Sequence, residues 1–309
     1  MATVKNYLSL VTFSHTIFAM PFAMIGFTLG IINHASVFGV SQWNLNKTIG
    51  WDWDITNLRW PYVGNFLLVI LCMVFARSAA MAFNRYLDKN FDALNARTAI
   101  REIPAGIISA NKALLFTVIN ALLFIACTWL INPICFYLSP VALLVVLGYS
   151  FTKRFTPLCH LILGLGLSLA PIGAYLAVTG YFSVLPVLFS LAVIFWVSGF
   201  DIIYALQDVD FDRQHRLYSI PAWLGKKNAL RVSSFLHLLS AVSVLVAGIY
   251  GGFNILYWAG ALVFAGMLIY QHSIVNPTDI SRVNRAFMTA NGFASVVFAV
   301  FVISDRLIF

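Results

Sequence analysis

Residues 61–92, PYVGNFLLVILCMVFARSAAMAFNRYLDKNFD, join an apolar run to a polar end. The apolar part is longer than the roughly 20 residues that cross the core of a bilayer. The polar end carries Asn84, Asp88 and Asp92. These three stack on one helical face, because a helix turns once in about 3.6 residues. The stretch therefore predicts a transmembrane helix that presents carboxylates at one membrane surface.

The composition of the whole chain agrees with this interpretation. Of its 309 residues 61% are hydrophobic and 10% are charged, and the mean hydropathy is +0.88. A soluble domain has roughly 25% charged residues, so this chain has too few to cover a surface that faces water. We therefore predict an all-α, polytopic, integral membrane protein whose solvent is the lipid bilayer.

Hydropathy predicts about nine transmembrane helices in a single domain, 1–309. The predicted helices are 9–33, 61–87, 112–131, 134–150, 159–179, 182–204, 229–250, 252–272 and 283–304. Most of the basic residues fall in loops on one side, and the positive-inside rule places the N-terminus and these loops in the cytoplasm. The segment 34–60, which holds four tryptophans, is expected to be an extracytoplasmic interfacial loop.

Two other classes of site are not favoured. The net charge of +8 resides in short loops and not on a basic face with interleaved aromatic residues, so no nucleic-acid partner is expected. The four cysteines, Cys72, Cys127, Cys135 and Cys159, lie in or beside apolar spans without a CxxC pair. They are interpreted as small core residues and not as a disulfide or zinc framework.

A second acidic stretch, 201–212 (DIIYALQDVDFD), follows the first after four predicted spans. Asp208 and Asp212 each stand 120 residues after an aspartate of the first stretch. In a continuous helix they would share a face with Asp201, while Asp210 would point away. An even number of spans lies between, so both stretches emerge at the same membrane surface.

The matched spacing suggests that the chain consists of two pseudo-repeated halves, 1–132 and 133–309, each supplying one carboxylate pair. Carboxylates four residues apart on a helix repel each other unless a cation lies between them. Mg²⁺ prefers oxygen ligands and is typically held by one or two carboxylates plus phosphates of a substrate. Two facing pairs could hold Mg²⁺ ions that bridge a diphosphate and neutralise it as a leaving group. The alternative is a pair of solvated helix ends whose aspartates bind nearby Lys and Arg.

At these residues the chain resembles the UbiA superfamily of intramembrane aromatic prenyltransferases. The NxxxDxxxD signature of that family stands here as Asn84, Asp88 and Asp92. The second DxxxD signature stands as Asp208 and Asp212.

Three further features carry the resemblance along the chain. The YxxxK motif between the fourth and fifth helices matches Tyr149 and Lys153, with Arg154 following. The runs SHTIFAMPFA (14–23) and ARTAIREIPAG (96–106) also look like this family. The motifs occur in order over essentially the whole chain.

The resemblance implies a bundle of helices around a central cavity. A polyprenyl diphosphate would bind Mg²⁺ at the aspartates, with its tail in an apolar cavity open to lipid. Ionisation would give an allylic cation, which an electron-rich aromatic carbon attacks. The nearest branch is that of 4-hydroxybenzoate polyprenyltransferases, and similar enzymes use 1,4-dihydroxy-6-naphthoate; both belong to quinone biosynthesis (ubiquinone or menaquinone). The sequence does not separate these aromatic acids and leaves the oligomeric state open.

The resemblance also implies a role for each residue of the motifs. The implied Mg²⁺ ligands are Asp88, Asp92, Asp208 and Asp212. The implied substrate-binding residues are Asn84, Arg77, Arg97, Arg101 and Arg154. Among them Arg154 is the candidate for the carboxylate of the acceptor, and the others are candidates for the diphosphate.

The implied catalytic residues are Lys153, Tyr149 and Asp201. Lys153 would contact the diphosphate as a point charge, and Tyr149, one helical turn away, would face the same cavity. Asp201 would orient Lys153 or a metal-bound water, act as the base, or form a buried ion pair.

The main alternative function is a secondary transporter with a carboxylate-lined cation site. Transporters usually place such acids near the bilayer midplane, beside broken helices. Here the acids lie at predicted helix ends, which favours an enzyme that captures a diphosphate at the interface. A non-catalytic lipid-binding scaffold would not need aspartates in matched register.

Overall fold

The computed structural model describes residues 4–11, 18–37 and 60–309. Within these ranges every regular element is helical, and eight helices are long and apolar enough to cross a membrane, with α2 as a shorter apolar helix. The helices are α1 (Val4–Leu10), α2 (Met20–Val37), α4 (Trp60–Leu94), α5 (Ala110–Ile131), α6 (Pro133–Thr152), α7 (Cys159–Thr179), α8 (Val184–Ala205), α9 (Val209–Gln214), α10 (Ile220–Gly251), α11 (Ile255–Ile274) and α12 (Asn291–Ile308). A 3-10 turn, Leu206–Asp208, precedes α9, and a π-helical turn, Arg285–Ala290, precedes α12.

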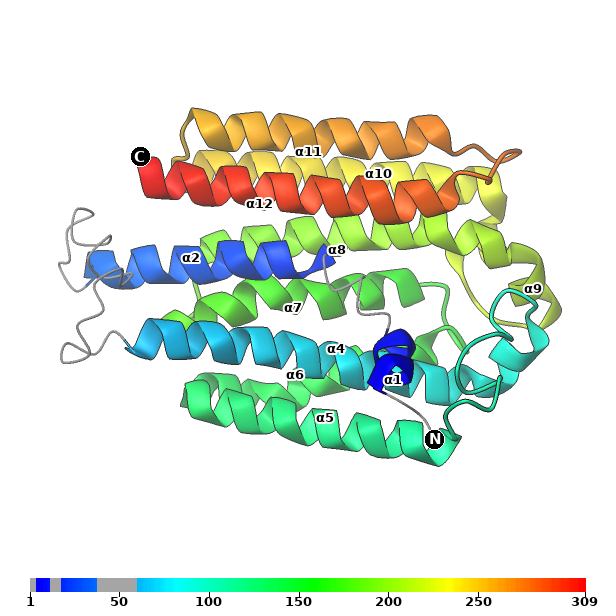
Figure 1. Ribbon diagram of the computed structural model, residues 1–309. Coiled ribbons are helices and arrows are strands. Elements are labelled where there is room, and N and C mark those ends of the chain that lie inside the picture. The colour runs from blue at the N-terminus through cyan, green and yellow to red at the C-terminus, as the bar shows by residue number, and fades with distance from the viewer. Residues whose placement is uncertain (1–3, 12–17, 38–59) are drawn as a thin grey trace.

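The long helices run side by side as a bundle (Figure 1). α10, α11 and α12 form one side of it, α4, α5 and α6 form the other, and α2, α7 and α8 lie between them. The short α9 and the loop after α4 lie together at one end of the bundle, which we call the acidic end. The predicted polytopic, all-α membrane fold is confirmed, whereas its division into two pseudo-repeated halves stays a prediction.

Several helix boundaries agree closely with those predicted from hydropathy; the largest differences are near the N-terminus, at the end of α4 and at the start of α10. The predicted helix 9–33 differs from the structure in its first part: α1 ends at Leu10, α2 begins at Met20, and residues 12–17 lie outside the described residues. Pro21 stands in the first turn of α2, where the missing N–H of proline has no helical partner to lose. Most of the expected interfacial loop 34–60 lies outside the described residues.

The predicted helix 229–250 begins earlier than expected, at Ile220, and contains one interruption. Gly225 has a φ of 78°, a backbone conformation that glycine adopts without a steric penalty. The short turn 220–224 therefore stands apart from the membrane-crossing part of α10, and it packs beside α9 at the acidic end.

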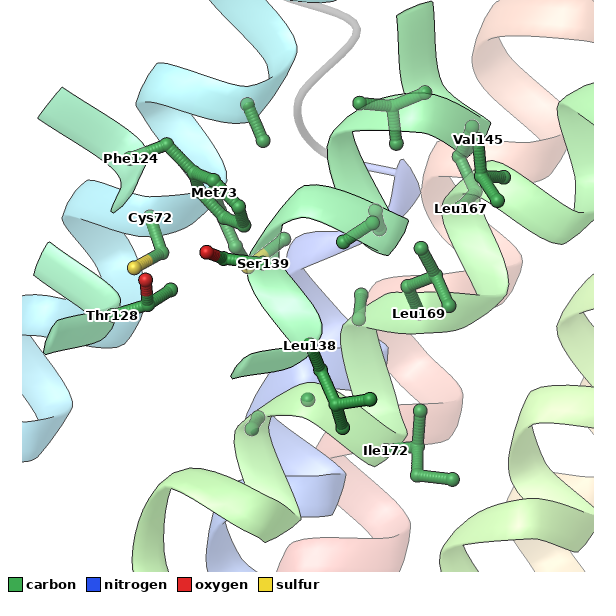
Figure 2. A pocket seen from close by; sticks show the side chains of 18 of the residues that line it. Cys72, Met73, Phe124, Thr128, Leu138, Ser139, Val145, Leu167, Leu169 and Ile172 are labelled. Carbon is green, nitrogen blue, oxygen red and sulfur yellow. The ribbon is translucent and has the colours of Figure 1, made fainter. Parts of the chain in front are cut away.

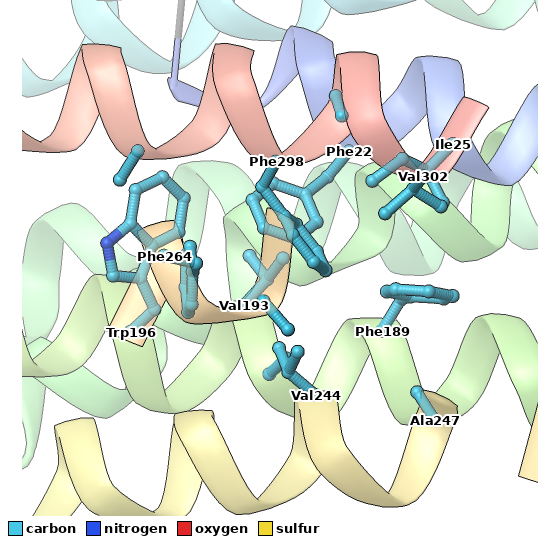
Figure 3. Packing of buried hydrophobic residues seen from close by; sticks show 14 of the residues in the cluster. Phe22, Ile25, Phe189, Val193, Trp196, Val244, Ala247, Phe264, Phe298 and Val302 are labelled. Atoms are coloured by element: carbon cyan, nitrogen blue, oxygen red, sulfur yellow. The ribbon is translucent and has the colours of Figure 1, made fainter. Parts of the chain in front are cut away.

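Aromatic side chains form the centre of the core between α2, α8, α11 and α12 (Figure 3). The ring of Phe22 lies 5.3 Å from that of Trp196 and 6.0 Å from that of Phe298, and all three are fully buried. Ring pairs at these centroid distances contribute about 0.5–1.5 kcal/mol beyond their area. This core holds α8 in place, and α8 leads directly to the second acidic stretch.

Close contacts through glycine hold α7 between α2 and α8. A Cβ on Gly26 of α2 would lie 2.0 Å from the carbonyl oxygen of Pro171. A Cβ on Gly164 of α7 would lie 2.5 Å from Ser198 Oγ of α8. Small residues at helix crossings allow backbones to approach closely in a membrane, and here they fix one wall of the cavity described below.

Candidate active site

The first acidic stretch lies at the end of α4, which continues beyond the apolar segment. At about 1.5 Å per residue, 35 residues extend well past a bilayer core of about 30 Å. Asn84 Nδ2 donates a hydrogen bond to Asp88 Oδ2 at 3.1 Å, so these two side chains share a helical face. The Asp88 and Asp92 side chains are 28% and 8% exposed.

The second acidic stretch is not one continuous helix, although Tyr204 and Asp208, two members of the expected shared face, both bond Arg97. The helix tightens into the 3-10 turn Leu206–Asp208 before α9 begins. Positions three apart eclipse on such a turn, and Leu206 and Val209 are both buried in the core. Asp212 is fully buried, whereas Asp210 is exposed, as predicted.

Each of the four motif aspartates has a basic partner within 4 Å. The pairs are Asp88 with Arg154 (3.4 Å), Asp92 with Arg101 (2.6 Å), Asp208 with Arg97 (2.6 Å) and Asp212 with Lys153 (2.7 Å). The Arg97 guanidinium bonds both oxygens of its partner, the second through Nε at 3.2 Å. Such two-point contacts fix orientation as well as distance.

These four ion pairs bring the two acidic stretches together. Arg97 and Arg101, from the loop after α4, each contact a different stretch, and so do the neighbours Lys153 and Arg154 at the end of α6. In addition, Asn95 Nδ2 donates directly to Asp208 Oδ1 at 3.3 Å. Residues far apart in the chain therefore form one polar cluster at the acidic end.

Lys153 and Arg97 stay charged at any ordinary pH. Burial lowers the pKa of Lys153, but the charge of Asp212 and its hydrogen bond outweigh burial and hold that pKa above the ordinary value. The pKa of Arg97 is raised in the same way, because Asp208 and Tyr204 outweigh the effect of burial. The ammonium and guanidinium groups are therefore permanent positive charges in the cluster.

The carboxylates fit Mg²⁺ that shares its coordination with a substrate. Among the described residues, no three His, Cys, Asp or Glu side chains gather into a metal cage. Instead the acids stand in pairs, and Asp92 Oδ2 is buried without a hydrogen-bond partner in the described part of the chain. Hard oxygen donors that leave coordination positions for phosphate oxygens are the arrangement that Mg²⁺ prefers.

A cavity of about 410 Å³ lies between α4, α5, α6 and α7, beside this cluster. Its walls are mainly aliphatic, and Figure 2 shows Leu138, Leu167 and Leu169 among the side chains around it. Arg77 and Tyr149 are among its few polar lining residues. All four cysteines are free thiols, as predicted, and Cys72 and Cys135 line the cavity.

The sequence-predicted residues thus separate into two places. The polar cluster contains the four aspartates, Lys153, Arg97, Arg101 and Arg154, together with Asn84. Arg77 lies 11 residues before Asp88, about 16 Å away along α4, and lines the cavity instead. The Tyr149 hydroxyl lies between the two places, within electrostatic reach of Asp88, Asp201 and Arg77.

Asp201 has a partner that sequence reasoning missed. It does not pair with Lys153; its Oδ2 lies 2.7 Å from Nδ1 of His160 in the first turn of α7. The only sequence signal for this pair is one ionisable residue in each of two predicted transmembrane helices, and such residues tend to pair inside a bundle.

Three further polar residues of the cluster, Asn95, Tyr204 and Ser219, belong to none of the sequence motifs. Tyr204 accepts a hydrogen bond from Arg97 at 3.1 Å, and its ring lies 4.3 Å from that of Phe287. Ser219 donates to Asp212 Oδ2 at 2.9 Å. Asn95 and Ser219 stand in or beside loops, so their proximity to the aspartates arises only from the fold.

Comparison with known proteins identifies the family. A model of the UbiA prenyltransferase family matches residues 55–296. The chain belongs to this family. It is 33% identical over 236 residues to the 4-hydroxybenzoate octaprenyltransferase of Tolumonas auensis, covering 76% of this chain and 82% of that protein. The enzyme of the same name from Aeromonas hydrophila is 29% identical over 79% of this chain and 85% of its own.

Solved structures of the family share this fold. The apo structure of a UbiA homologue from Aeropyrum pernix K1 superimposes with a TM-score of 0.77 at 29% identity, over 94% of this chain and 98% of that one. A UbiA homologue from Archaeoglobus fulgidus, solved with DMAPP and Mg²⁺, has the same fold, with a TM-score of 0.72 at 20% identity over 97% and 99% of the two chains. The UbiA protein described here is therefore an integral membrane enzyme, a prenyltransferase.

Proposed function

We propose that this UbiA protein transfers a polyprenyl group from a polyprenyl diphosphate to an aromatic acid, with Mg²⁺, in quinone (ubiquinone or menaquinone) biosynthesis. The acceptor is 4-hydroxybenzoate or 1,4-dihydroxy-6-naphthoate. The observation that carries the proposal is the meeting of four aspartates and four basic side chains beside an apolar cavity. The names of the relatives at 27–33% identity support the class of acceptor.

The diphosphate binds at the polar cluster by an exchange of partners. In the structure the four acids and four bases pair with one another. With the diphosphate and Mg²⁺ bound, the four aspartates would hold the metal, and Lys153, Arg97 and Arg101 would contact phosphate oxygens. Bound Mg²⁺ supplies Lewis-acid neutralisation of the leaving group. Asn84 donates a hydrogen bond to Asp88 and so fixes the orientation of that carboxylate.

The apolar cavity receives the first part of the prenyl tail. Tyr149 stands one turn, about 6 Å, before Lys153 on α6, so a diphosphate at Lys153 directs its allylic carbon toward this hydroxyl. Apolar walls exclude water, so the allylic cation that forms when the C–O bond breaks meets the aromatic acceptor and not a water molecule.

Arg77 and Arg154 are rival partners for the acceptor carboxylate. Arg154 is already engaged with Asp88 and with the carbonyl oxygen of Leu87. Arg77 lines the cavity well below the polar cluster. A guanidinium at that depth can bind a carboxylate inside the cavity, so we assign Arg77 to the acceptor and Arg154 to holding Asp88.

We further propose that the acidic end and the N-terminus face the cytoplasm. The support is the excess of Lys and Arg in the loops of this end, which the positive-inside rule places in the cytoplasm. Labelling of single cysteines in intact cells, one in the loop after α4 and one near Phe309, tests this orientation. If a membrane-impermeant reagent labelled the loop after α4 in intact cells, the proposed orientation would be reversed.

The activity itself is tested with the purified protein in nanodiscs. Labelled geranyl or farnesyl diphosphate is supplied with a panel of aromatic acids, in Mg²⁺ or in EDTA. We expect coupling to 4-hydroxybenzoate or 1,4-dihydroxy-6-naphthoate in Mg²⁺ and none in EDTA. If the protein couples the prenyl group to none of the acceptors and instead takes up substrate into vesicles in a cation-dependent way, the proposed transfer is wrong and a transporter function is favoured.

A further inference from the structure

His160 and Asp201 form a buried pair that the diphosphate site does not use. His160 lies in the first turn of α7, and Asp201 lies on α8, with Nδ1 and Oδ2 2.7 Å apart. The His160 side chain is 3% exposed and that of Asp201 is 23% exposed. The carboxylate therefore has an open side, whereas the imidazole is enclosed.

The hydrogen-bond partners of His160 determine where its proton lies. Nε2 is 3.3 Å from the backbone nitrogen of Ile220. A backbone N–H can only donate, so Nε2 presents its lone pair and the ring proton is on Nδ1, directed at Asp201. Ser198 Oγ also donates to the carbonyl oxygen of His160 at 3.1 Å, which holds the backbone there against α8. His160 thus donates from Nδ1 to Asp201 and holds that carboxylate in place.

Asp201 lies deeper in the bundle than the second acidic motif, on a helix that packs against α7, one wall of the cavity. It stands seven residues before Asp208, about 10 Å deeper along the helix. The hydroxyl of Tyr149, which lines the cavity, lies within electrostatic reach of the Asp201 carboxylate. Among the described residues, the bond from His160 is the one hydrogen bond to this carboxylate, so its other oxygen is available to a ligand.

We propose that Asp201 accepts the proton lost by the aromatic ring and that His160 is the positioning residue that holds it for this task. The inference rests on the proposed prenyl transfer. The allylic C–O bond breaks with both electrons leaving on the diphosphate, and the ring carbon forms a C–C bond to the allylic carbon. The electrons of the ring C–H bond then return to the ring as its proton moves to Asp201 Oδ1. The neutral carboxylic acid later returns the proton to water.

His160 itself does not fit the role of base. Its lone pair is occupied by the Ile220 N–H, and the ring is enclosed. The four motif aspartates are also unsuited, because each is bonded to a basic side chain and directed at the diphosphate. Asp201 combines a carboxylate with one oxygen that has no hydrogen bond among the described residues and a position on α8, which packs against a wall of the cavity.

The test compares Asp201→Asn, His160→Ala and His160→Asn in the full-length protein in nanodiscs. A positioned base typically contributes 10²–10⁴-fold to a rate, so Asp201→Asn is expected to lower kcat about 10²-fold or more. His160→Ala is expected to give a smaller loss. The side-chain amide in His160→Asn places a hydrogen-bond donor near the former Nδ1 position. This variant should therefore recover part of the activity that His160→Ala loses. KM for the prenyl diphosphate should change less than about threefold in all of them.

Ser190→Ala is the matched control. Ser190 Oγ donates to the carbonyl oxygen of Ser168 at 2.8 Å, so this variant also removes a buried α7–α8 hydrogen bond. It lies 11 residues before Asp201, about 16 Å away along α8. We expect unchanged kcat for it.

Two isotope measurements separate a role in proton transfer from a structural role. With an acceptor deuterated at the reacting ring position, wild-type protein should show an isotope effect near one, and Asp201→Asn and His160→Ala should show a larger one. Scrambling of ¹⁸O between bridging and non-bridging positions of the diphosphate reports ionisation alone, and it should persist in both variants.

The inference would be overturned if Asp201→Asn kept the kcat of the wild type. It would also be overturned if this variant lost ¹⁸O scrambling and coupling equally, without a rise in the isotope effect. A loss in His160→Ala that appears entirely in KM for the diphosphate would remove the positioning role. Absence of coupling by the wild-type protein with every acceptor would instead remove the proposed function.

Discussion

The two ends of the bundle use aspartate in opposite ways. At the acidic end, Asp88 and Asp208 are partly exposed, with side chains 28% and 13% accessible, and their ion-pair partners are flexible basic side chains. At the opposite end, Asp305 of α12 is fully buried. It accepts hydrogen bonds from the backbone nitrogens of Asn254 and Tyr257 at 3.0 and 3.1 Å.

The two ends differ in whether the carboxylate can exchange its hydrogen-bond or ion-pair partner for another. Asp305 caps the first turn of α11 from another helix, and backbone N–H groups cannot turn to a different partner. Beside it, Arg306 lies over the ring of Phe253 at 3.6 Å and donates to the carbonyl oxygen of Gly251. Under the proposed function, the aspartates of the acidic end release Lys or Arg and take a metal ion. A carboxylate bonded to side chains is thus available for ligand binding, and one bonded to backbone is structural.

The strongest expected effect is loss of transfer in Asp88→Ala or Asp208→Ala. Each variant removes a proposed Mg²⁺ ligand, and loss of one such electrostatic contact to the leaving group should lower kcat/KM by about 10³-fold or more. Labelled-product formation measures the effect, and size-exclusion chromatography in detergent checks that the bundle is intact. Retained turnover in a folded variant would refute the metal assignment.

Lys153→Ala should have the next largest effect, about 10²-fold on kcat/KM for the prenyl diphosphate. The variant removes a permanent positive charge and leaves Asp212 buried without its ion pair. Lys153→Arg keeps the charge and should recover part of the loss, although guanidinium geometry differs from that of an ammonium. Equal activity of Lys153→Ala and wild type would exclude a diphosphate contact.

Arg77→Ala and Arg154→Ala distinguish the two candidates for the acceptor. A charge-assisted hydrogen bond contributes about 1.5–3 kcal/mol, so Arg77→Ala should raise KM for the aromatic acid roughly tenfold to a hundredfold. Arg154→Ala should raise KM for the diphosphate instead, because it frees Asp88. Steady-state kinetics with each substrate varied decides between them, and the reverse pattern would return the acceptor carboxylate to Arg154.

Asp305→Ala should leave transfer within about twofold of wild type. It removes a cap from two backbone N–H groups, a loss of about 1–2 kcal/mol, so the thermal unfolding midpoint in detergent should fall by a few degrees. Light-scattering or fluorescence melts measure the shift. Inactivity at an unchanged midpoint would contradict the division between a functional and a structural end.

Local pattern in the sequence is enough to predict most of the fold. Apolar runs of bilayer length are independent of their neighbours, so hydropathy predicts a helix over 159–179, and α7 has those bounds. The first helix is predicted less well, since hydropathy does not detect that Pro21 belongs to a first turn. The interruption at Gly225 escapes prediction for a similar reason, because one glycine leaves no periodic signal.

The residues of the site are predictable only where a motif repeats. Spacing and an even number of intervening spans are enough to place Asp88, Asp92, Asp208 and Asp212 at one membrane surface. Which basic residue each aspartate meets is not predictable in this way, because the ion pairs join residues 9 to 111 positions apart.

By itself, the sequence determined the solvent, the approximate spans and the emergence of both acidic stretches at a common end of the bundle, because these follow from hydropathy and helical period. Only the tertiary structure decided that Arg97 bonds Asp208, that Arg77 lines a cavity and that His160 meets Asp201. These contacts depend on how α4, α6, α7 and α8 pack, and packing is set by side-chain shape across the whole bundle.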